Sequence, residues 1–225
     1  MKIILDNIAV PDSIAPGGNS ERHSRHIRNV GRLDHDVSHN AVADEFIKEG
    51  DWVVDAGAYI GTHTVHYLER VGHEGRVLAF EVNPLSFECL SHNCPHSILY
   101  NMGLSDEARE IGLHFKGNPA ATYCASLRKT QIKSCLRTLD SFNLLRLDFY
   151  KIDVEGYELK VLNGSRETIE RCKPVILLEI NPKSLQRYGV VPKDLTDFLE
   201  LFGYTCEELF GAGARKSWDL ICKVK

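Results

Sequence analysis

The stretch that most constrains the fold of this chain runs from Val53 to Gly61 and reads VVDAGAYIG. Two β-branched residues end a predicted buried strand, an acid and small residues follow, and a helix is predicted to begin near Thr62. In such a strand–turn–helix unit, glycine lets the backbone approach a ligand that a Cβ atom would exclude. Turns of this kind at the carboxyl end of a parallel strand bind nucleotide-like ligands. The sequence therefore predicts an α/β fold with a ligand site at this turn.

The acid that leads the turn, Asp55, restricts the chemistry of that ligand. A carboxylate there would repel a pyrophosphate and attract a ligand with cationic groups. S-adenosylmethionine carries a sulfonium and an ammonium group, so Asp55 favours it over NAD. A second predicted strand, 76–81, ends in Glu81, 24 residues after Gly57, about where a carboxylate accepts hydrogen bonds from ribose hydroxyls. An NAD-dependent oxidoreductase, the rival enzyme class, would share Glu81 but would want glycine in place of Ala58.

Length and composition set the broad class of the protein. The chain has 225 residues, enough for one α/β domain, and its 43% hydrophobic and 26% charged residues are ordinary for a soluble globular protein. The net charge of -4 gives no reason to expect nucleic acid as a partner. No apolar run approaches the ~20 residues of a membrane span. The apolar run among the first residues is too short for the core of a signal peptide. The seven scattered cysteines predict reduced thiols in a cytoplasmic protein.

Alternating strand and helix patterns predict a doubly wound sheet with helices on both faces. Residues 1–38 are expected to form an N-terminal extension, with a helix over 20–29, and residues 39–225 a single cofactor-binding domain. The last two predicted strands, 204–210 and 218–224, leave no room for a helix between them. They must therefore pair as an antiparallel hairpin at the edge of a mixed, Rossmann-like sheet.

Charged and polar residues gather where the later strands end. Lys151, Asp153 and Glu155 alternate along one strand end and so point the same way on an extended chain. Three charges at the mouth of a central strand are costly unless they are used or paired. The next strand ends in Glu179 and Asn181, and Asp153, Glu179 and Asn181 together offer three oxygen ligands for Mg²⁺.

These motifs, in this order, resemble the FkbM-type methyltransferases of the class I S-adenosylmethionine-dependent superfamily, over residues from about 40 to 182. The segments that carry the resemblance are DAGAYIGT from Asp55, EVNP from Glu81, NMGLSD from Asn101, LD at 139–140, and KIDVEGYE at 151–158, which is the most specific. The resemblance implies the class I methyltransferase fold and methyl transfer to a hydroxyl group, usually on a sugar or a small natural product. Tyr59 departs from the usual pattern, in which asparagine is common.

The resemblance also implies that residues 55–64, 81–83 and 101–104 line the cofactor pocket, with Asp153 near the transferred methyl group. The residues expected there are Asp55, Ala56, Gly57, Ala58, Tyr59, Gly61, Thr62, Thr64, Glu81, Val82, Asn83, Asn101, Gly103, Leu104 and Asp153.

An acceptor hydroxyl attacks poorly unless its proton is removed as it reacts. The candidates for this step are Asp153, Glu155, Lys151 and His39. Glu158 is expected to cap the helix that follows. A protein that binds the cofactor without catalysis is the alternative, but it would not need the three charges at 151–155.

Overall fold

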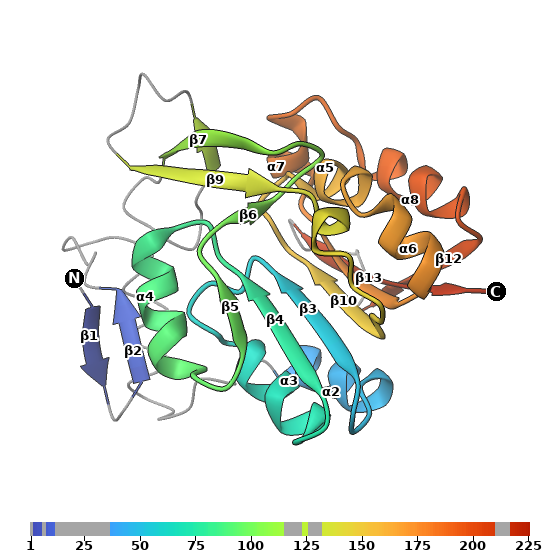
Figure 1. The fold of residues 1–225 in the computed structure, drawn as a ribbon. Helices are drawn as coiled ribbons and strands as arrows, with labels where there is room; N and C mark the ends of the chain where they lie inside the picture. Colours follow the sequence, from blue (N-terminus) through green and yellow to red (C-terminus); the bar gives the residue numbers. More distant parts are fainter. Residues whose placement is uncertain (1, 6–7, 12–36, 115–122, 126–131, 210–216) are drawn as a thin grey trace.

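The computed structural model describes residues 2–5, 8–11, 37–114, 123–125, 132–209 and 217–225 (Figure 1). Its centre is a seven-stranded sheet of order β12-β13-β11-β10-β3-β4-β5. The strands are β3 (Trp52–Ala56), β4 (Arg76–Phe80), β5 (Ile98–Tyr100), β10 (Phe149–Ile152), β11 (Val175–Ile180), β12 (Tyr204–Leu209) and β13 (Trp218–Val224). The neighbours from β11 to β5 pair in parallel, and β13 lies antiparallel between β11 and β12. The predicted doubly wound mixed sheet with a terminal hairpin is confirmed.

Helices cover both faces of this sheet, so its strands are apolar on both sides. Val54, Tyr150 and Leu178 point into one core, beneath helices on the C-terminal side of the chain. Val53 and Phe149 point into the other core, beneath helices that precede and follow β3. The first group comprises η1 (Leu139–Phe142), α5 (Glu158–Asn163), α6 (Arg166–Cys172), α7 (Pro182–Gln186) and α8 (Pro192–Glu200), and the second comprises α2 (Val37–Phe46) and α3 (Thr64–Val71). Helix α4 (Pro84–Asn93) contributes Leu90 to a smaller cluster with Ala79 of β4.

A second, four-stranded sheet lies above the carboxyl ends of β3 and β4 (Figure 1). Its strands are β6 (Gly103–Leu104), β7 (Arg109–His114), β8 (Tyr123–Ala125) and β9 (Lys133–Arg137). Ile111, Leu113 and Leu136 pack against Tyr157 and Val82, which belong to the loops after β10 and β4. This sheet is therefore attached to the same edge of the main sheet that the glycine turn occupies.

The N-terminal strands β1 (Lys2–Leu5) and β2 (Ile8–Pro11) form an antiparallel hairpin beside α4 (Figure 1). The predicted boundary after residue 38 falls inside α2. The helix predicted over residues 20–29 lies outside the described part of the chain.

Two cysteines of the terminal hairpin form a disulfide bond. Cys206 and Cys222 are register partners across β12 and β13, with their Cα atoms 4.1 Å apart. The prediction that all cysteines are reduced is wrong for this pair, because antiparallel pairing brings together thiols that are 16 residues apart in sequence. Among the described residues, Cys89, Cys94, Cys135 and Cys172 are outside any disulfide bond.

None of the helices in the described ranges has the length and apolar character that a membrane crossing requires.

Candidate functional site

A row of charged side chains crosses the carboxyl end of the main sheet. On β3, β10 and β11, the side chains that face α2 and α3 change from apolar to charged as each strand ends. The pairs are Val53 and Asp55, Phe149 and Lys151, and Leu177 and Glu179. The strand registers then bring these charged ends side by side, so that the row runs, in order across the sheet, through Asp55, Lys151, Asp153, Glu179 and Asp219.

Lys151 is the centre of this row and joins the glycine turn to the end of β10. Its Nζ lies 3.2 Å from Asp55 Oδ1 and 3.6 Å from Asp153 Oδ2, and it donates to the Gly57 carbonyl at 3.3 Å. The side chain is only 3% exposed. Burial opposes its charge, but the carboxylates of Asp55 and Asp153 outweigh burial and raise the pKa of Lys151. Lys151 therefore acts as a fixed cation that holds two segments in register.

Asp55 is fully buried, and both of its carboxylate oxygens are engaged within the protein. Oδ1 faces Lys151, and Oδ2 accepts a hydrogen bond of 2.7 Å from the Thr64 hydroxyl. The Asp55 carboxylate therefore holds Thr64 and Lys151 in place behind the turn, and its predicted attraction for a cationic ligand stays a prediction.

The turn itself needs glycine at position 57. Gly57 has φ of 81°, and a Cβ atom there would lie 1.8 Å from the carbonyl oxygen of Asp153. Tyr59 also adopts a left-handed conformation, with φ of 53°. The close approach of Gly57 to Asp153 makes the glycine turn and the end of β10 one packed unit.

Glu81 closes the other side of the turn. Its Oε2 accepts from the Tyr59 amide at 2.8 Å and its Oε1 from the Asn83 amide at 2.7 Å, while Asn101 donates to its backbone carbonyl at 2.9 Å. Burial raises the pKa of Glu81 to about 7. Each carboxylate oxygen keeps a second lone pair. Acceptance of hydrogen bonds from the ribose of an adenosyl cofactor by Glu81 stays a prediction.

The other residues predicted to bind cofactor divide into two groups. Ala56, Ala58 and Leu104 are core residues, and Asn83 is a buried N-cap of α4 whose Oδ1 accepts from the Leu85 amide at 3.0 Å. Their role in cofactor binding stays a prediction. Residues on the turn and on the loops after β4 and β5 form the second group, which consists of Gly61, Thr62, Val82, Asn101 and Gly103. Direct contact of these residues with a cofactor stays a prediction.

Acidic side chains concentrate at the end of β10 and β11. The charge of Asp153, together with burial, raises the pKa of Glu179 well above its ordinary value, which favours the protonated form of Glu179 beside Asp153. Asp153 is the more open of the two, with a side chain that is 38% exposed. Burial also raises the pKa of Glu155, whose Oε2 accepts from the Ser184 hydroxyl at 3.2 Å.

The predicted magnesium ligands do not fit that role. The Asn181 side-chain oxygen accepts from the Ser184 amide at 3.2 Å as the N-cap of α7. Within the described ranges, no group of three or more His, Cys, Asp or Glu side chains is arranged to hold a metal ion.

His39 lies at the far end of the charged row. Its Nε2 is 3.4 Å from Asp219 Oδ2, and its ring centroid is 4.7 Å from that of His63. Asp219 is the register partner of Glu179. The predicted role of His39 as a base stays a prediction. Among the candidate bases, Asp153 is the one that contacts Lys151.

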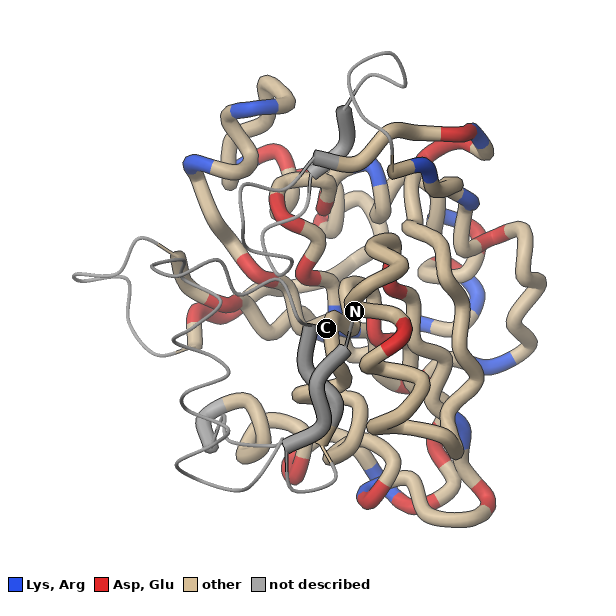
Figure 2. Tube along the Cα trace, turned by 90° about the vertical axis from the view of Figure 1, so that its left-hand side faces the viewer, with Lys and Arg blue, Asp and Glu red and all other residues tan. Residues whose placement is uncertain are grey.

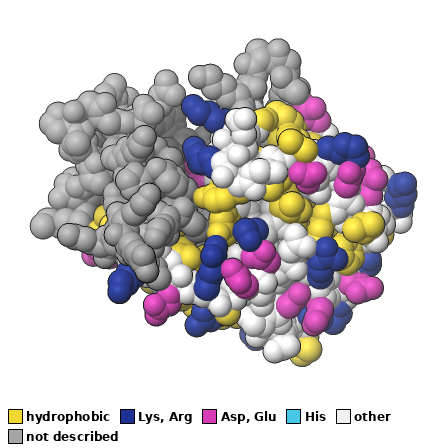
Figure 3. Space-filling model, turned by 90° about the horizontal axis from the view of Figure 1, so that it is seen from above, with side chains coloured by type: hydrophobic (Ala, Val, Ile, Leu, Met, Phe, Trp, Pro, Cys, Tyr) yellow, Lys and Arg dark blue, Asp and Glu magenta, His cyan; other side chains and the backbone are white. Residues whose placement is uncertain are grey.

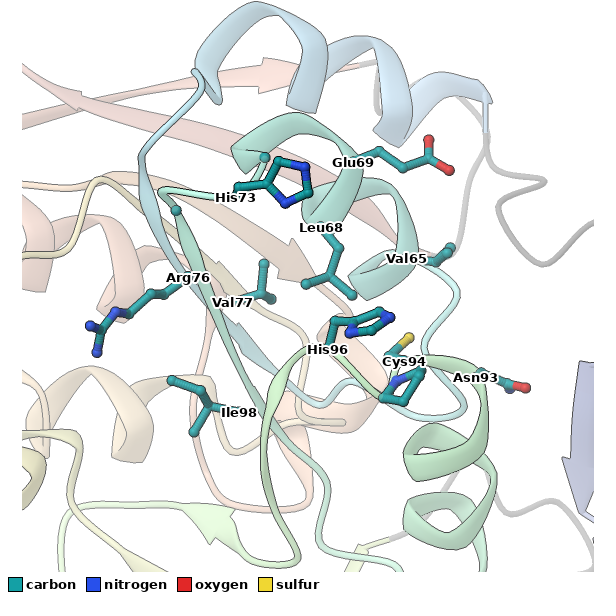
Figure 4. A pocket seen from close by; sticks show the side chains of 13 residues that line it. Val65, Leu68, Glu69, His73, Arg76, Val77, Asn93, Cys94, His96 and Ile98 are labelled. Atoms are coloured by element: carbon teal, nitrogen blue, oxygen red, sulfur yellow. The ribbon is translucent and has the colours of Figure 1, made fainter.

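A cavity of about 650 Å³ lies at the opposite end of β4 and β5, behind the glycine turn (Figure 4). Val65, Leu68, Val77 and Ile98 give it an apolar lining, and His73 and His96 stand at its sides. On its wall, Asn93 Nδ2 donates to the Ile60 carbonyl at 2.8 Å. Asn93, the last residue of α4, therefore supports the glycine turn from the side of this cavity.

Basic and acidic residues are interspersed along the described chain (Figure 2). Viewed from above, onto the end of the molecule that carries the second sheet, the described surface mixes both signs with apolar side chains (Figure 3). The expectation that nucleic acid is not a partner stays a prediction.

The chain is similar in sequence to known methyltransferases. The sequence profile of the "Methyltransferase FkbM domain" matches residues 55–206. The hexuronic acid methyltransferase AglP of Haloferax volcanii is 30% identical over 165 residues, 69% of this chain and 64% of AglP. The chain thus spans just under two thirds of the curated relative that it matches.

Solved structures share the fold at low sequence identity. The methyltransferase FkbM from Methylobacillus flagellatus KT superposes with a TM-score of 0.58 and 16% identity, covering 81% of this chain and 50% of that one. The Aeropyrum pernix fibrillarin in complex with natively bound S-adenosyl-L-methionine superposes with a TM-score of 0.52 and 15% identity, covering 83% and 73%.

Proposed function

Because this chain belongs to the FkbM methyltransferase domain family, we propose that it is an S-adenosylmethionine-dependent methyltransferase that methylates a hydroxyl group on a sugar or small natural product. The observation that carries the proposal is the contact of one buried Lys151 ammonium with Asp55, Gly57 and Asp153. It couples the turn that suits a cofactor to the carboxylate that suits an acceptor. A module that only bound the cofactor would not need the second half of this arrangement.

Each half of the site has a distinct task in this proposal. S-adenosylmethionine, when bound, supplies a methyl group on a positively charged sulfur. Glu81 accepts hydrogen bonds from the ribose hydroxyls, and the backbone at Gly57 leaves room for the ligand. Asp153 accepts the proton of the acceptor hydroxyl as that oxygen reacts. The proton on Glu179 limits the charge repulsion that Asp153 would otherwise meet from its neighbour.

The name of the Haloferax volcanii relative supports a sugar as the acceptor class. We propose hydroxylated sugars, including those that carry a uronic acid, as the acceptors to test first. The second sheet, β6 to β9, is attached over the same sheet edge, where it would contact an acceptor larger than the reacting group.

The first experiment is calorimetric titration of the purified protein with S-adenosylmethionine and, separately, with NADH. We expect binding of the methyl donor in the micromolar range and none of NADH. Binding of NADH alone would overturn the proposal in favour of an oxidoreductase. Donor binding without methyl transfer to any sugar would favour the non-catalytic module.

The second experiment measures methyl transfer with and without EDTA, for the wild type and for Asp153→Asn. We expect the rate to be unchanged by EDTA. We expect Asp153→Asn to lower kcat by about 100-fold with donor affinity unchanged, because general-base catalysis typically contributes that much. A metal requirement would restore the magnesium prediction, and an unchanged rate in Asp153→Asn would remove this residue from the mechanism.

The cytoplasmic location is part of the same proposal, and it has to accommodate the Cys206–Cys222 disulfide, a kind of bond that persists mainly outside reducing compartments. Mass spectrometry of the protein, alkylated directly in its own cells, distinguishes a reducing compartment from an oxidising one. A reduced pair supports the cytoplasm, and a fully oxidised pair supports an oxidising compartment.

A further inference from the structure

The turn that carries Asp153 and Glu155 adopts an uncommon backbone conformation. Glu155 has φ of 55° and Gly156 has φ of 103°, so two successive residues have positive φ angles. A non-glycine residue in this region is strained and persists only where its surroundings hold it. This turn therefore needs anchors from outside itself.

One anchor is Glu158, which stands at the start of α5. Its Oε1 accepts two hydrogen bonds, from the Val154 amide at 3.2 Å and from the Gly156 amide at 3.0 Å. The sequence predicted that Glu158 would cap the first turn of its own helix. The structure shows it binding the amides that precede the helix, so it fixes the turn rather than the helix.

The second anchor is Ser184 of α7. Its hydroxyl donates to Glu155 Oε2 at 3.2 Å, and a Cβ atom on Gly156 would lie 2.4 Å from the Ser184 carbonyl oxygen. Glu158 and Ser184 thus hold three consecutive residues of the turn, Val154, Glu155 and Gly156, which directly follow Asp153.

Glu158 is only 1% exposed, and its second oxygen, Oε2, is buried without a hydrogen-bond partner in the described part of the protein. Burial raises the pKa of Glu158 to about 7. An unsatisfied buried oxygen lowers stability, so stability alone does not favour this carboxyl group. A requirement of the site accounts for it better.

We propose that Glu158 is a positioning residue that fixes the turn 153–156 and so sets where Asp153 meets the acceptor hydroxyl. This inference rests on the proposed methyltransferase function. Glu158→Gln keeps an acceptor oxygen for the two amides, whereas Glu158→Leu removes it and keeps a similar volume. Asp140 provides the matched control, because its carboxylate likewise accepts from the amides of Glu167 and Thr168, at 3.1 and 2.8 Å, at the start of α6.

The test compares Glu158→Gln, Glu158→Leu and Asp140→Leu with the wild type in methyl transfer and in donor binding. We expect Glu158→Leu to lose about tenfold or more in kcat with donor affinity within about threefold, since misplacement of a reacting group is costly. Glu158→Gln should recover kcat to within about threefold of the wild type. Asp140→Leu should lose stability but not kcat.

Hydrogen–deuterium exchange gives a second readout that does not need turnover. The amides of Val154 and Gly156 should exchange faster in Glu158→Leu and stay protected in Glu158→Gln. Unchanged protection and kcat in Glu158→Leu would overturn the inference, as would a kcat loss no larger than that of Asp140→Leu. An inactive wild-type protein would instead overturn the proposed function, while the exchange experiment would still report on the Glu158 contacts.

Discussion

At the scale of single residues, burial determines what each charged group of the site does. Asp55 and Lys151 are almost completely inaccessible, and each satisfies the other's charge. Asp153 is the partly exposed member of the set. Asp55 and Lys151 therefore hold the site together, and Asp153 is the member of this charged cluster that stays partly exposed.

Lys151→Met tests the holding role. Removing the ammonium leaves the Asp55 carboxylate buried beside an apolar chain, and breaking a buried ion pair in this way costs about 3–5 kcal/mol. We expect a loss of that size in the free energy of unfolding, measured with urea. Lys160→Met is the control, because the Lys160–Asp106 pair, at 2.8 Å, is partly exposed and should contribute less than about 1 kcal/mol. Equal losses in the two variants would contradict this account.

Glu81→Gln tests the ribose contact and its pH dependence. The pKa of Glu81 is raised to about 7, so its carboxylate becomes protonated as the pH falls below neutrality. A protonated carboxyl is a weaker acceptor, and we expect the affinity for S-adenosylmethionine to fall between pH 8 and pH 6, values that bracket this pKa of about 7. Calorimetry should show this trend in the wild type. In Glu81→Gln the affinity should be about tenfold lower or more and independent of pH over this range. The exposed Glu74→Gln should behave as the wild type.

At the scale of elements, the turn after β3 shows how close packing restricts a motif. Gly57 and Gly203 have nearly the same φ, 81° and 83°, but only Gly57 would bring a Cβ atom against backbone, while nothing lies within 4 Å of Gly203. The pair separates the conformational cost of an L-residue from the steric cost of a clash.

Gly57→Ala and Gly203→Ala use this difference. The second change should cost only about 1 kcal/mol, the penalty for a left-handed alanine. The first should cost clearly more in thermal unfolding and should abolish binding of S-adenosylmethionine, since the turn and the end of β10 would have to move apart. Similar stability and retained donor binding in both variants would show that the contact with Asp153 is not needed.

The disulfide of the terminal hairpin belongs to the same scale. Closing a loop of 16 residues removes unfolded-state entropy that corresponds to about 3 kcal/mol. We expect Cys206→Ser to lower the melting temperature under oxidising conditions and to match the wild type in the presence of a reductant. Cys135→Ser changes a thiol that is free in the structure, and it should have little effect under either condition.

At the scale of the whole molecule, the acidic groups give stability a predictable dependence on pH. The pKa values of Glu81 and Glu158 are raised to about 7 in the folded protein. The folded state therefore binds more protons than the unfolded state between about pH 4.5 and pH 7, and stability falls as the pH rises through this range. We expect urea midpoints of the wild type to decrease from pH 5 to pH 8. Glu158→Gln should reduce that slope, whereas the exposed Glu200→Gln should not.

The sequence by itself determined the fold class and the family. Buried parallel strands are apolar on both faces, and the glycine turn, Glu81 and the 151–158 motif are contiguous signals that local chemistry makes readable. The terminal hairpin followed from the short segment between the two last predicted strands, 204–210 and 218–224, which leaves no room for a helix.

Only the tertiary structure decided the roles of the charged residues. Whether Asp55 faces a ligand depends on Lys151, which is 96 residues away and becomes its neighbour through the register of β3 and β10. The same holds for Asn181, whose oxygen serves as a helix cap, and for Cys206, whose partner lies on the next strand. Burial and pairing across strands set charge and accessibility, and neither is encoded in the local pattern of the chain.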